Sequence, residues 1–235
     1  MPGRASARNG KNGSSMALTR FTGAVFDLDG LLIDSERLWE KAQMAVFAEL
    51  GLELTLEMQR STTGMRLQEA LRIWQGFFPA APLDGSHLNR RMNALMIAEY
   101  AKAAAPMPGA VRALDLCADA GCRLAVASSS PPEVIAAALE GLAVADRFHA
   151  VVSAALETHG KPHPAVFLSA AARIGADPGR CIAFEDSVAG VRAAKAAGMY
   201  CVAVPEGHNR GRPEYAIADR ILDSLEAFPP GDLVA

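Results

Sequence analysis

The sequence lacks three features that would assign it to large classes of protein: long apolar runs, an excess of basic residues and paired cysteines. No apolar stretch approaches the roughly 18 residues needed to span a bilayer. The formal net charge is −3, which gives no electrostatic reason to expect binding to nucleic acid. The four cysteines show no Cys-x-x-Cys spacing, and we interpret them as buried thiols in a reducing cytosol rather than as disulfides or zinc ligands. A cytoplasmic protein with neither membrane nor nucleic-acid partners is therefore expected.

The first 20 residues lack an apolar core of their own. They are rich in Gly, Ser, Asn and Arg, and we predict that they are disordered. Without an apolar h-region they are not a secretory signal, although they faintly resemble a transit peptide. An upstream start before Met16 explains them at least as well.

Downstream of this tail, short apolar runs alternate with helix-like segments. Runs of this kind, bounded by turn residues, are typical of buried parallel strands. They are Gly23–Phe26, Arg123–Ala127, Ala150–Ser153, Cys181–Phe184, Tyr200–Val204 and Arg220–Leu222. The alternation predicts an α/β fold with a doubly wound, Rossmann-like parallel sheet.

One segment between the first two strand-like runs breaks the alternation. From about Glu36 to Ala104 the apolar residues recur at helical spacing, and we predict an all-helical insertion there. Pro106-Met107-Pro108-Gly109 is a plausible hinge at its end. We therefore expect a catalytic core of residues 21–35 and 106–235 and a helical cap domain of residues 36–105.

Asp27-Leu28-Asp29-Gly30 directly follows the first strand-like run. In open α/β sheets, ligands bind at the carboxyl ends of the strands. Two carboxylates at positions i and i+2 share one side of an extended backbone. Such a pair can bind a hard cation and leave one carboxylate free to attack or to transfer protons. An isolated Asp-x-Asp is usually a solvated loop, so this interpretation depends on the rest of the chain.

Three further stretches place polar groups at comparable positions. Ser128-Ser129-Ser130 follows the second strand-like run, Gly160-Lys161-Pro162 forms a turn before a helix, and Glu185-Asp186-Ser187 follows the run at Cys181–Phe184. In their order and context the four stretches resemble the haloacid dehalogenase-like phosphohydrolase superfamily, from about residue 23 to residue 225. The resemblance implies the strand order 5-4-1-2-3, with a helical cap above the catalytic end of the sheet.

The resemblance also implies a role for each aspartate of the first motif. Asp27 is the implied nucleophile, which forms an aspartyl-phosphate, and it is also an implied ligand of Mg²⁺. Asp29 is implied to bind the metal through its backbone carbonyl. Its side chain is implied to protonate the leaving alkoxide and then to activate water, which requires a protonated carboxyl when substrate arrives.

The other motifs supply charge and hydrogen bonds in the same way. Asp186 is an implied metal ligand, and Glu185 is implied to bind the metal directly or through water. Ser128 and Ser129 are implied to contact the phosphoryl oxygens, and Lys161 to screen the phosphate from the nucleophile. The implied cofactor is Mg²⁺, which keeps positions open for water and phosphate.

Several residues outside these motifs are weaker candidates. Trp39 is close enough to the first motif to line a substrate site. Arg66 opens a helix of the cap, where a substrate contact and a solvated side chain are equally expected. His159 and His163 have zinc-like spacing, but the glycine and proline between them preclude a helical ligand pair. The loop 207–212 is expected to be mobile, with a place at the rim of the site as the alternative.

The branch most resembled is that of the small sugar- and polyol-phosphate phosphatases with a helical cap. The motif stretches 27–36 and 63–66 resemble hexitol and 2-deoxyglucose-6-phosphate phosphatases, and 184–187 also resembles pseudouridine-5′-phosphate phosphatase. We predict Mg²⁺-dependent hydrolysis of a small sugar, polyol or nucleoside monophosphate, by a monomer or weak homodimer. One alternative is a β-phosphoglucomutase-like phosphoryl transfer, but Trp39 and Pro132 stand where that branch has His and Asn. The other is an inactive phosphate-binding protein, which the complete set of motif residues disfavours.

Overall fold

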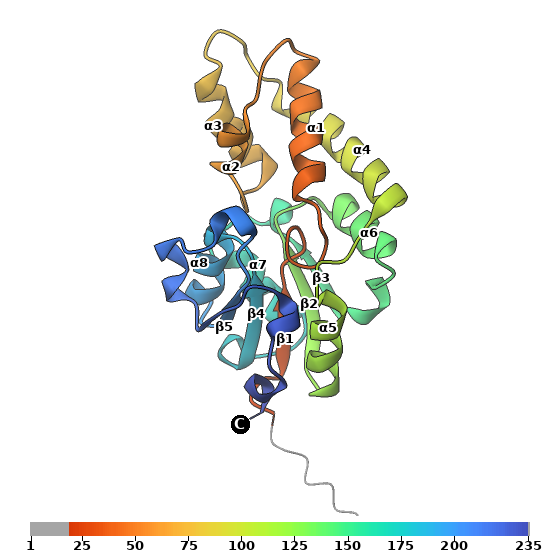
Figure 1. The fold of residues 1–235 in the computed structure, drawn as a ribbon, viewed down its shortest axis with the longest axis vertical. Coiled ribbons are helices and arrows are strands. Elements are labelled where there is room, and N and C mark those ends of the chain that lie inside the picture. The colour runs from red at the N-terminus through yellow and green to blue at the C-terminus, as the bar shows by residue number, and fades with distance from the viewer. Residues whose placement is uncertain (1–18, 235) are drawn as a thin grey trace, which may run out of the picture.

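A parallel six-stranded sheet forms the centre of the computed structural model, which describes residues 19–234 (Figure 1). Its order is β3-β2-β1-β4-β5-β6, and each neighbouring pair is parallel. The strands are β1 (Gly23–Phe26), β2 (Arg123–Ser128), β3 (Ala150–Ser153), β4 (Cys181–Glu185), β5 (Tyr200–Ala203) and β6 (Arg220–Ile221). The predicted fold class is therefore confirmed, and so is the order of the first five strands.

Helices cover both faces of the sheet because each central strand is apolar on both sides. In β1, Phe26 faces a cluster that includes residues of α5 and α6, and Val25 faces a cluster that includes residues of α7 and α8. Phe26 also stacks on Phe184 of β4, with ring centroids 4.5 Å apart. These helices are α5 (Ala110–Asp119), α6 (Pro132–Gly141), α7 (Ala165–Arg173) and α8 (Val188–Ala196).

Five helices lie between β1 and β2 in the chain, and the first four of them stand at one end of the sheet (Figure 1). They are α1 (Glu36–Ala48), α2 (Leu56–Arg60), α3 (Leu67–Phe77) and α4 (Gly85–Ala103), and we refer to these four helices with their connecting loops as the cap. The cap has its own apolar cluster around Phe47 and Trp74, whose rings pack edge to face. The helical character of this segment agrees with the sequence.

The ends of the described chain lie at the opposite end of the sheet from the cap (Figure 1). Thr19 forms an antiparallel bridge with Val234, and the Arg20 N–H donates to the carbonyl of Leu233. The disorder predicted for residues 1–20 thus falls largely on residues 1–18, which lie outside the described residues. The four cysteines are buried and unpaired, as predicted. Between residues 19 and 234, no helix combines the length and apolar character that a bilayer crossing requires.

Candidate active site

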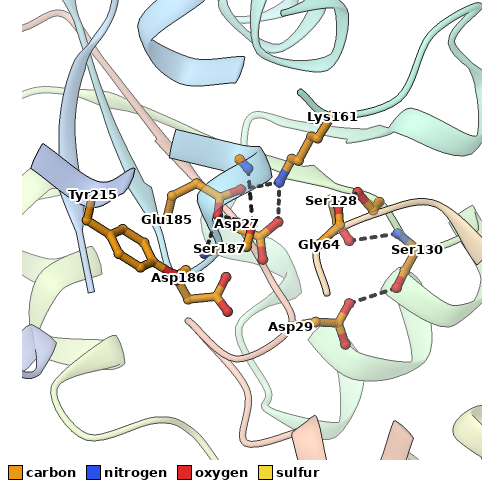
Figure 2. A network of polar contacts seen from close by, with 12 residues as sticks. Asp27, Asp29, Gly64, Ser128, Ser130, Lys161, Glu185, Asp186, Ser187 and Tyr215 are labelled. Atoms are coloured by element: carbon orange, nitrogen blue, oxygen red, sulfur yellow. Dashed lines mark hydrogen bonds and ion pairs between the residues drawn. The ribbon is translucent and has the colours of Figure 1, made fainter. Parts of the chain in front are cut away.

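Three buried carboxylates meet where the two central strands end beneath the cap. β1 and β4 are in register with Phe26 opposite Phe184, so Asp27 lies beside Glu185. The Asp27 N–H donates to the carbonyl of Phe184 at 3.0 Å, which continues the ladder to the start of the loop. Asp27, Glu185 and Asp186 each offer an oxygen within 4.8 Å of the others, and Figure 2 shows their carboxylates close together.

Lys161 lies between two of these carboxylates. Its Nζ donates to Asp27 Oδ1 at 2.5 Å and to Glu185 Oε1, and the side chain is almost fully buried (Figure 2). Burial opposes the charge of the ammonium, but the carboxylates of Asp27 and Glu185 outweigh burial and raise the pKa of Lys161. Lys161 is therefore a permanent cation in the site.

The site holds more negative charge than Lys161 can neutralise. Burial raises the pKa of Asp27 to about 8; Lys161 partly offsets this increase, and Glu185 adds to it. Burial, then repulsion from Glu185 and Asp27, raises the pKa of Asp186 well above its ordinary value. An all-oxygen donor set of this kind fits a hard divalent cation. Within residues 19–234 no other cluster of His, Cys, Asp and Glu with this geometry occurs, and neither His159 nor His163 belongs to one.

Glu185 is fixed by the first turn of α8. Its Oε2 accepts hydrogen bonds from the Ser187 N–H at 3.0 Å and the Ser187 hydroxyl at 3.1 Å. Ser187 Oγ in turn accepts from the Gly190 N–H at 3.0 Å, which makes Ser187 the N-cap of the helix. The Tyr215 hydroxyl donates to the carbonyl of Asp186 at 2.6 Å (Figure 2). The helix thus begins in a way that holds the acidic pair at the end of β4.

Asp29 is held by three donors, two of which come from the cap. Its Oδ1 accepts from Trp39 Nε1 at 2.8 Å and from the Tyr100 hydroxyl at 2.7 Å, and its Oδ2 accepts from the Ser130 hydroxyl at 2.7 Å. Burial and the charge of Asp29 raise the pKa of Tyr100, which therefore remains a protonated donor. The sequence indicated Trp39 as a residue near the site, but nothing in it indicated Tyr100, which is buried in the apolar stripe of α4.

The three serines of the triplet Ser128-Ser129-Ser130 make different contacts. Ser128 is fully buried at the end of β2, and its Oγ accepts from the Ser130 N–H at 3.0 Å. Ser129 donates to the carbonyl of Gly64 in the cap at 2.8 Å. Ser130 bonds Asp29, as described above. The sequence predicted contacts for Ser128 and Ser129 but missed Ser130.

Arg66, predicted as a possible substrate contact, has other partners and does not line the cavity described below. Its Nη1 donates to the carbonyls of Ala154 at 3.3 Å and Glu157 at 2.8 Å, and its Nη2 pairs with Glu69. Glu69 also accepts a hydrogen bond from the backbone N–H of Gly160, next to Lys161. Arg66 therefore joins the cap to the segment that follows β3, and its partner Glu69 joins the cap to the turn at Gly160.

A cavity of about 150 Å³ opens between the cap and the sheet. Core residues that line it include Asp27, Asp29, Ser129, Asp186 and Glu206, and Trp39 belongs to the cap side. Residues 207–212, considered as a possible rim, are not among the lining residues. Burial and the neighbouring Glu36 raise the pKa of Glu206 to about 8.

The sequence profile of the haloacid dehalogenase-like hydrolases matches residues 21–198. Hexitol phosphatase B of Escherichia coli K12 is 35% identical over 212 residues, which are 90% of this chain and 96% of the relative. β-Phosphoglucomutase of Bacillus subtilis is 30% identical over 78% of this chain and 83% of its own length. The crystal structure of a mutant CbbY from Rhodobacter sphaeroides in complex with xylulose-(1,5)bisphosphate is 27% identical, with a TM-score of 0.82 over 92% of this chain and 100% of that chain.

Proposed function

This chain belongs to the haloacid dehalogenase-like hydrolase family and is a phosphatase, and we propose that it uses Mg²⁺ and an aspartyl-phosphate intermediate to hydrolyse small sugar, polyol or nucleoside monophosphates. One observation carries this proposal: Asp27, paired with Lys161, lies in an acidic cluster at the floor of a cavity beneath the cap. The position of Asp29, held beside the same cavity, supports a separate proton-transfer group.

The metal assignment follows from the charge of the cluster. We assign Asp27, Asp186 and the backbone carbonyl of Asp29 as metal ligands, and Glu185 as a ligand that binds directly or through water. When bound, Mg²⁺ neutralises the negative charge that would otherwise keep Asp27 and the substrate phosphate apart. Lys161 cannot do this alone, because its single charge faces both Asp27 and Glu185.

The chemical steps assign one task to each remaining side chain. The Asp27 carboxylate attacks phosphorus, the bond to the leaving oxygen breaks, and Asp29 donates a proton to that oxygen. Asp29 then accepts a proton from the water that attacks the aspartyl-phosphate, which releases inorganic phosphate and restores the carboxylate. Ser128 Oγ already accepts the Ser130 N–H, so its own O–H remains to donate to a phosphoryl oxygen.

The cap supports a small substrate. We propose that residues 36–105 enclose the leaving group and exclude bulk water. A folded phosphoprotein would not fit into a cavity of this size beneath the cap. The mutase alternative receives no support from this geometry, because Trp39 stands where that branch has a histidine and donates to Asp29.

The decisive experiment replaces the nucleophile. Asp27→Asn removes the attacking carboxylate but little volume, so kcat should fall below about a hundredth of wild type, a loss of roughly 2.7 kcal/mol in barrier height. Asp115→Asn is the matched control, since Asp115 lies on the exposed side of α5 and pairs with Arg147. Activity of both wild type and control should disappear in chelator and return with Mg²⁺. An Asp27→Asn enzyme that stays folded and keeps more activity than this would remove the nucleophile assignment.

A further inference from the structure

The cavity beneath the cap has an acidic wall. We use this term for Glu36 and Glu40 of α1 and Glu206 of the core, which all line the cavity. Arg60 is the one cationic side chain among the described lining residues, and its Nη2 donates to Glu40 at 3.4 Å. Among the residues described, the wall therefore has no cation that is not already beside a carboxylate.

The carboxylates of the acidic wall act on one another. Glu36 and Glu206 are joined by a side-chain hydrogen bond, and Glu40 also repels Glu206. The wall therefore holds three acidic side chains against the single guanidinium of Arg60. Glu40 and Arg60 offset each other, and the wall stays net negative.

The same cavity offers acceptors for hydroxyl groups. Gln59 lines it and is only 5% exposed. Its Nε2 donates to the carbonyl of Leu54, while its Oε1 is buried without a hydrogen-bond partner among the described residues. Gln43 lines the same side. Neutral hydroxyls can satisfy carboxylate and amide oxygens, whereas a second anionic group would meet like charge.

We propose that the acidic wall selects substrates whose leaving group is an uncharged polyol and rejects those with a second phosphate or a carboxylate at the far end. This inference rests on the proposed phosphatase function and narrows its substrate class. The proposal also predicts a difference in substrate from the relative CbbY, whose mutant was crystallised in complex with a bisphosphate. Glu40 is the residue through which the selection can be altered, because its removal also frees Arg60.

Two probes of the same carbon skeleton test the proposal. Glucitol 6-phosphate and 6-phosphogluconate differ at the far end, where one has a hydroxymethyl group and the other a carboxylate. Wild-type kcat/KM for glucitol 6-phosphate should be higher by at least about tenfold, which corresponds to about 1.4 kcal/mol. Glu40→Gln should narrow that ratio severalfold, and Glu40→Lys should narrow it further or invert it.

Glu49→Gln is the matched control, because Glu49 follows α1, also pairs with an arginine and lies outside the cavity. It should leave the ratio unchanged. Equal or better turnover of 6-phosphogluconate by wild type overturns the inference while the phosphatase function stands, and so does a ratio that Glu40→Gln does not change. If p-nitrophenyl phosphate and both probes are all untouched with Mg²⁺ present, the proposed function itself fails, and the inference with it.

Discussion

Gly190 gives the sharpest test of how closely the acidic cluster is packed. A Cβ built at this position would lie 1.8 Å from Glu185 Oε1 and 1.9 Å from its Cδ. Real Cβ contacts essentially never fall below 3.0 Å, so the carboxylate must shift by at least about 1.2 Å. Glu185 is completely buried and bonded to Lys161 and Ser187, so this shift cannot be a simple rotation into solvent.

Gly190→Ala should destabilise the protein, whereas a Gly→Ala substitution in a helix usually stabilises it. In an exposed helix interior, Gly→Ala stabilises by about 0.5–1 kcal/mol because glycine loses more backbone entropy on folding. In Gly190→Ala, overpacking costs about 1–3 kcal/mol, and disturbing a charged hydrogen bond costs roughly 1.5–3 kcal/mol more. After the helix gain is subtracted, we expect a net loss of about 2–5 kcal/mol, or a Tm lower by about 5–15 °C.

Gly76 provides the matched control in the same protein. It lies in α3, is exposed, and a Cβ there would have no neighbour within 4 Å. Gly76→Ala should raise Tm by about 1–4 °C. Thermal unfolding followed by circular dichroism, in chelator and with Mg²⁺, measures both variants. Because Glu185 anchors Lys161, Gly190→Ala should also lower kcat by at least about tenfold, whereas Gly76→Ala should leave kcat unchanged.

The double variant Gly190→Ala/Glu185→Asp tests whether the steric clash between the new methyl group and the Glu185 carboxylate causes the loss of stability. A shorter carboxylate leaves room for the new methyl group, so the double variant should be more stable than the sum of the two single effects. If Gly190→Ala is as stable as Gly76→Ala, or if the two changes are additive, the carboxylate is not confined as described.

Two further predictions concern contacts between the cap and the core. Tyr100→Phe should lower kcat roughly tenfold for an alkyl phosphate, because it removes one hydrogen-bond donor to Asp29. The loss in kcat should be smaller for p-nitrophenyl phosphate, whose leaving group needs little protonation. Equal losses for the two substrates would contradict an acid role for Asp29. Arg66→Lys should lower kcat/KM and speed hydrogen exchange at the Gly160 amide, because lysine cannot bond both core carbonyls and hold Glu69. The control is Arg72→Lys on the exposed face of α3. Unchanged hydrogen exchange in Arg66→Lys would refute the link between Arg66 and the turn that contains Lys161.

The core was predictable from the sequence because its signals are local. Each buried strand is a short apolar run, and each motif follows a strand or begins a helix, so parallel topology alone brings Asp27, Ser128, Lys161 and Asp186 to one edge of the sheet. Register then places Asp27 beside Glu185 without any signal beyond the run of apolar residues. This is why the strands agree with the sequence to within one or two residues.

The cap was less predictable because its important contacts join residues that are distant in the chain. Tyr100 reaches Asp29 across 71 positions, and its sequence context is that of an ordinary buried helix residue. For Arg66 the sequence predicted a substrate contact and a solvated side chain equally, and it did not indicate the two carbonyl partners that lie 88 and 91 positions away. Helical periodicity indicates which face is buried, but it does not indicate which hydroxyl or guanidinium finds a partner across an interface.

These distant contacts have a chemical consequence. The cap bonds the core beside three different parts of the proposed machinery: at Asp29 through Trp39 and Tyr100, at Ser129 through Gly64, and at the turn before Lys161 through Glu69. None of these bonds can persist if the cap moves away from the sheet. Asp29 and the Lys161 turn are therefore held in place by the same docking that encloses the substrate. A leaving group that prevents the cap from docking on the core loses its contacts with the acidic wall and also the correct orientation of Asp29 as proton donor. Cap residues that never touch the phosphate can therefore still affect kcat.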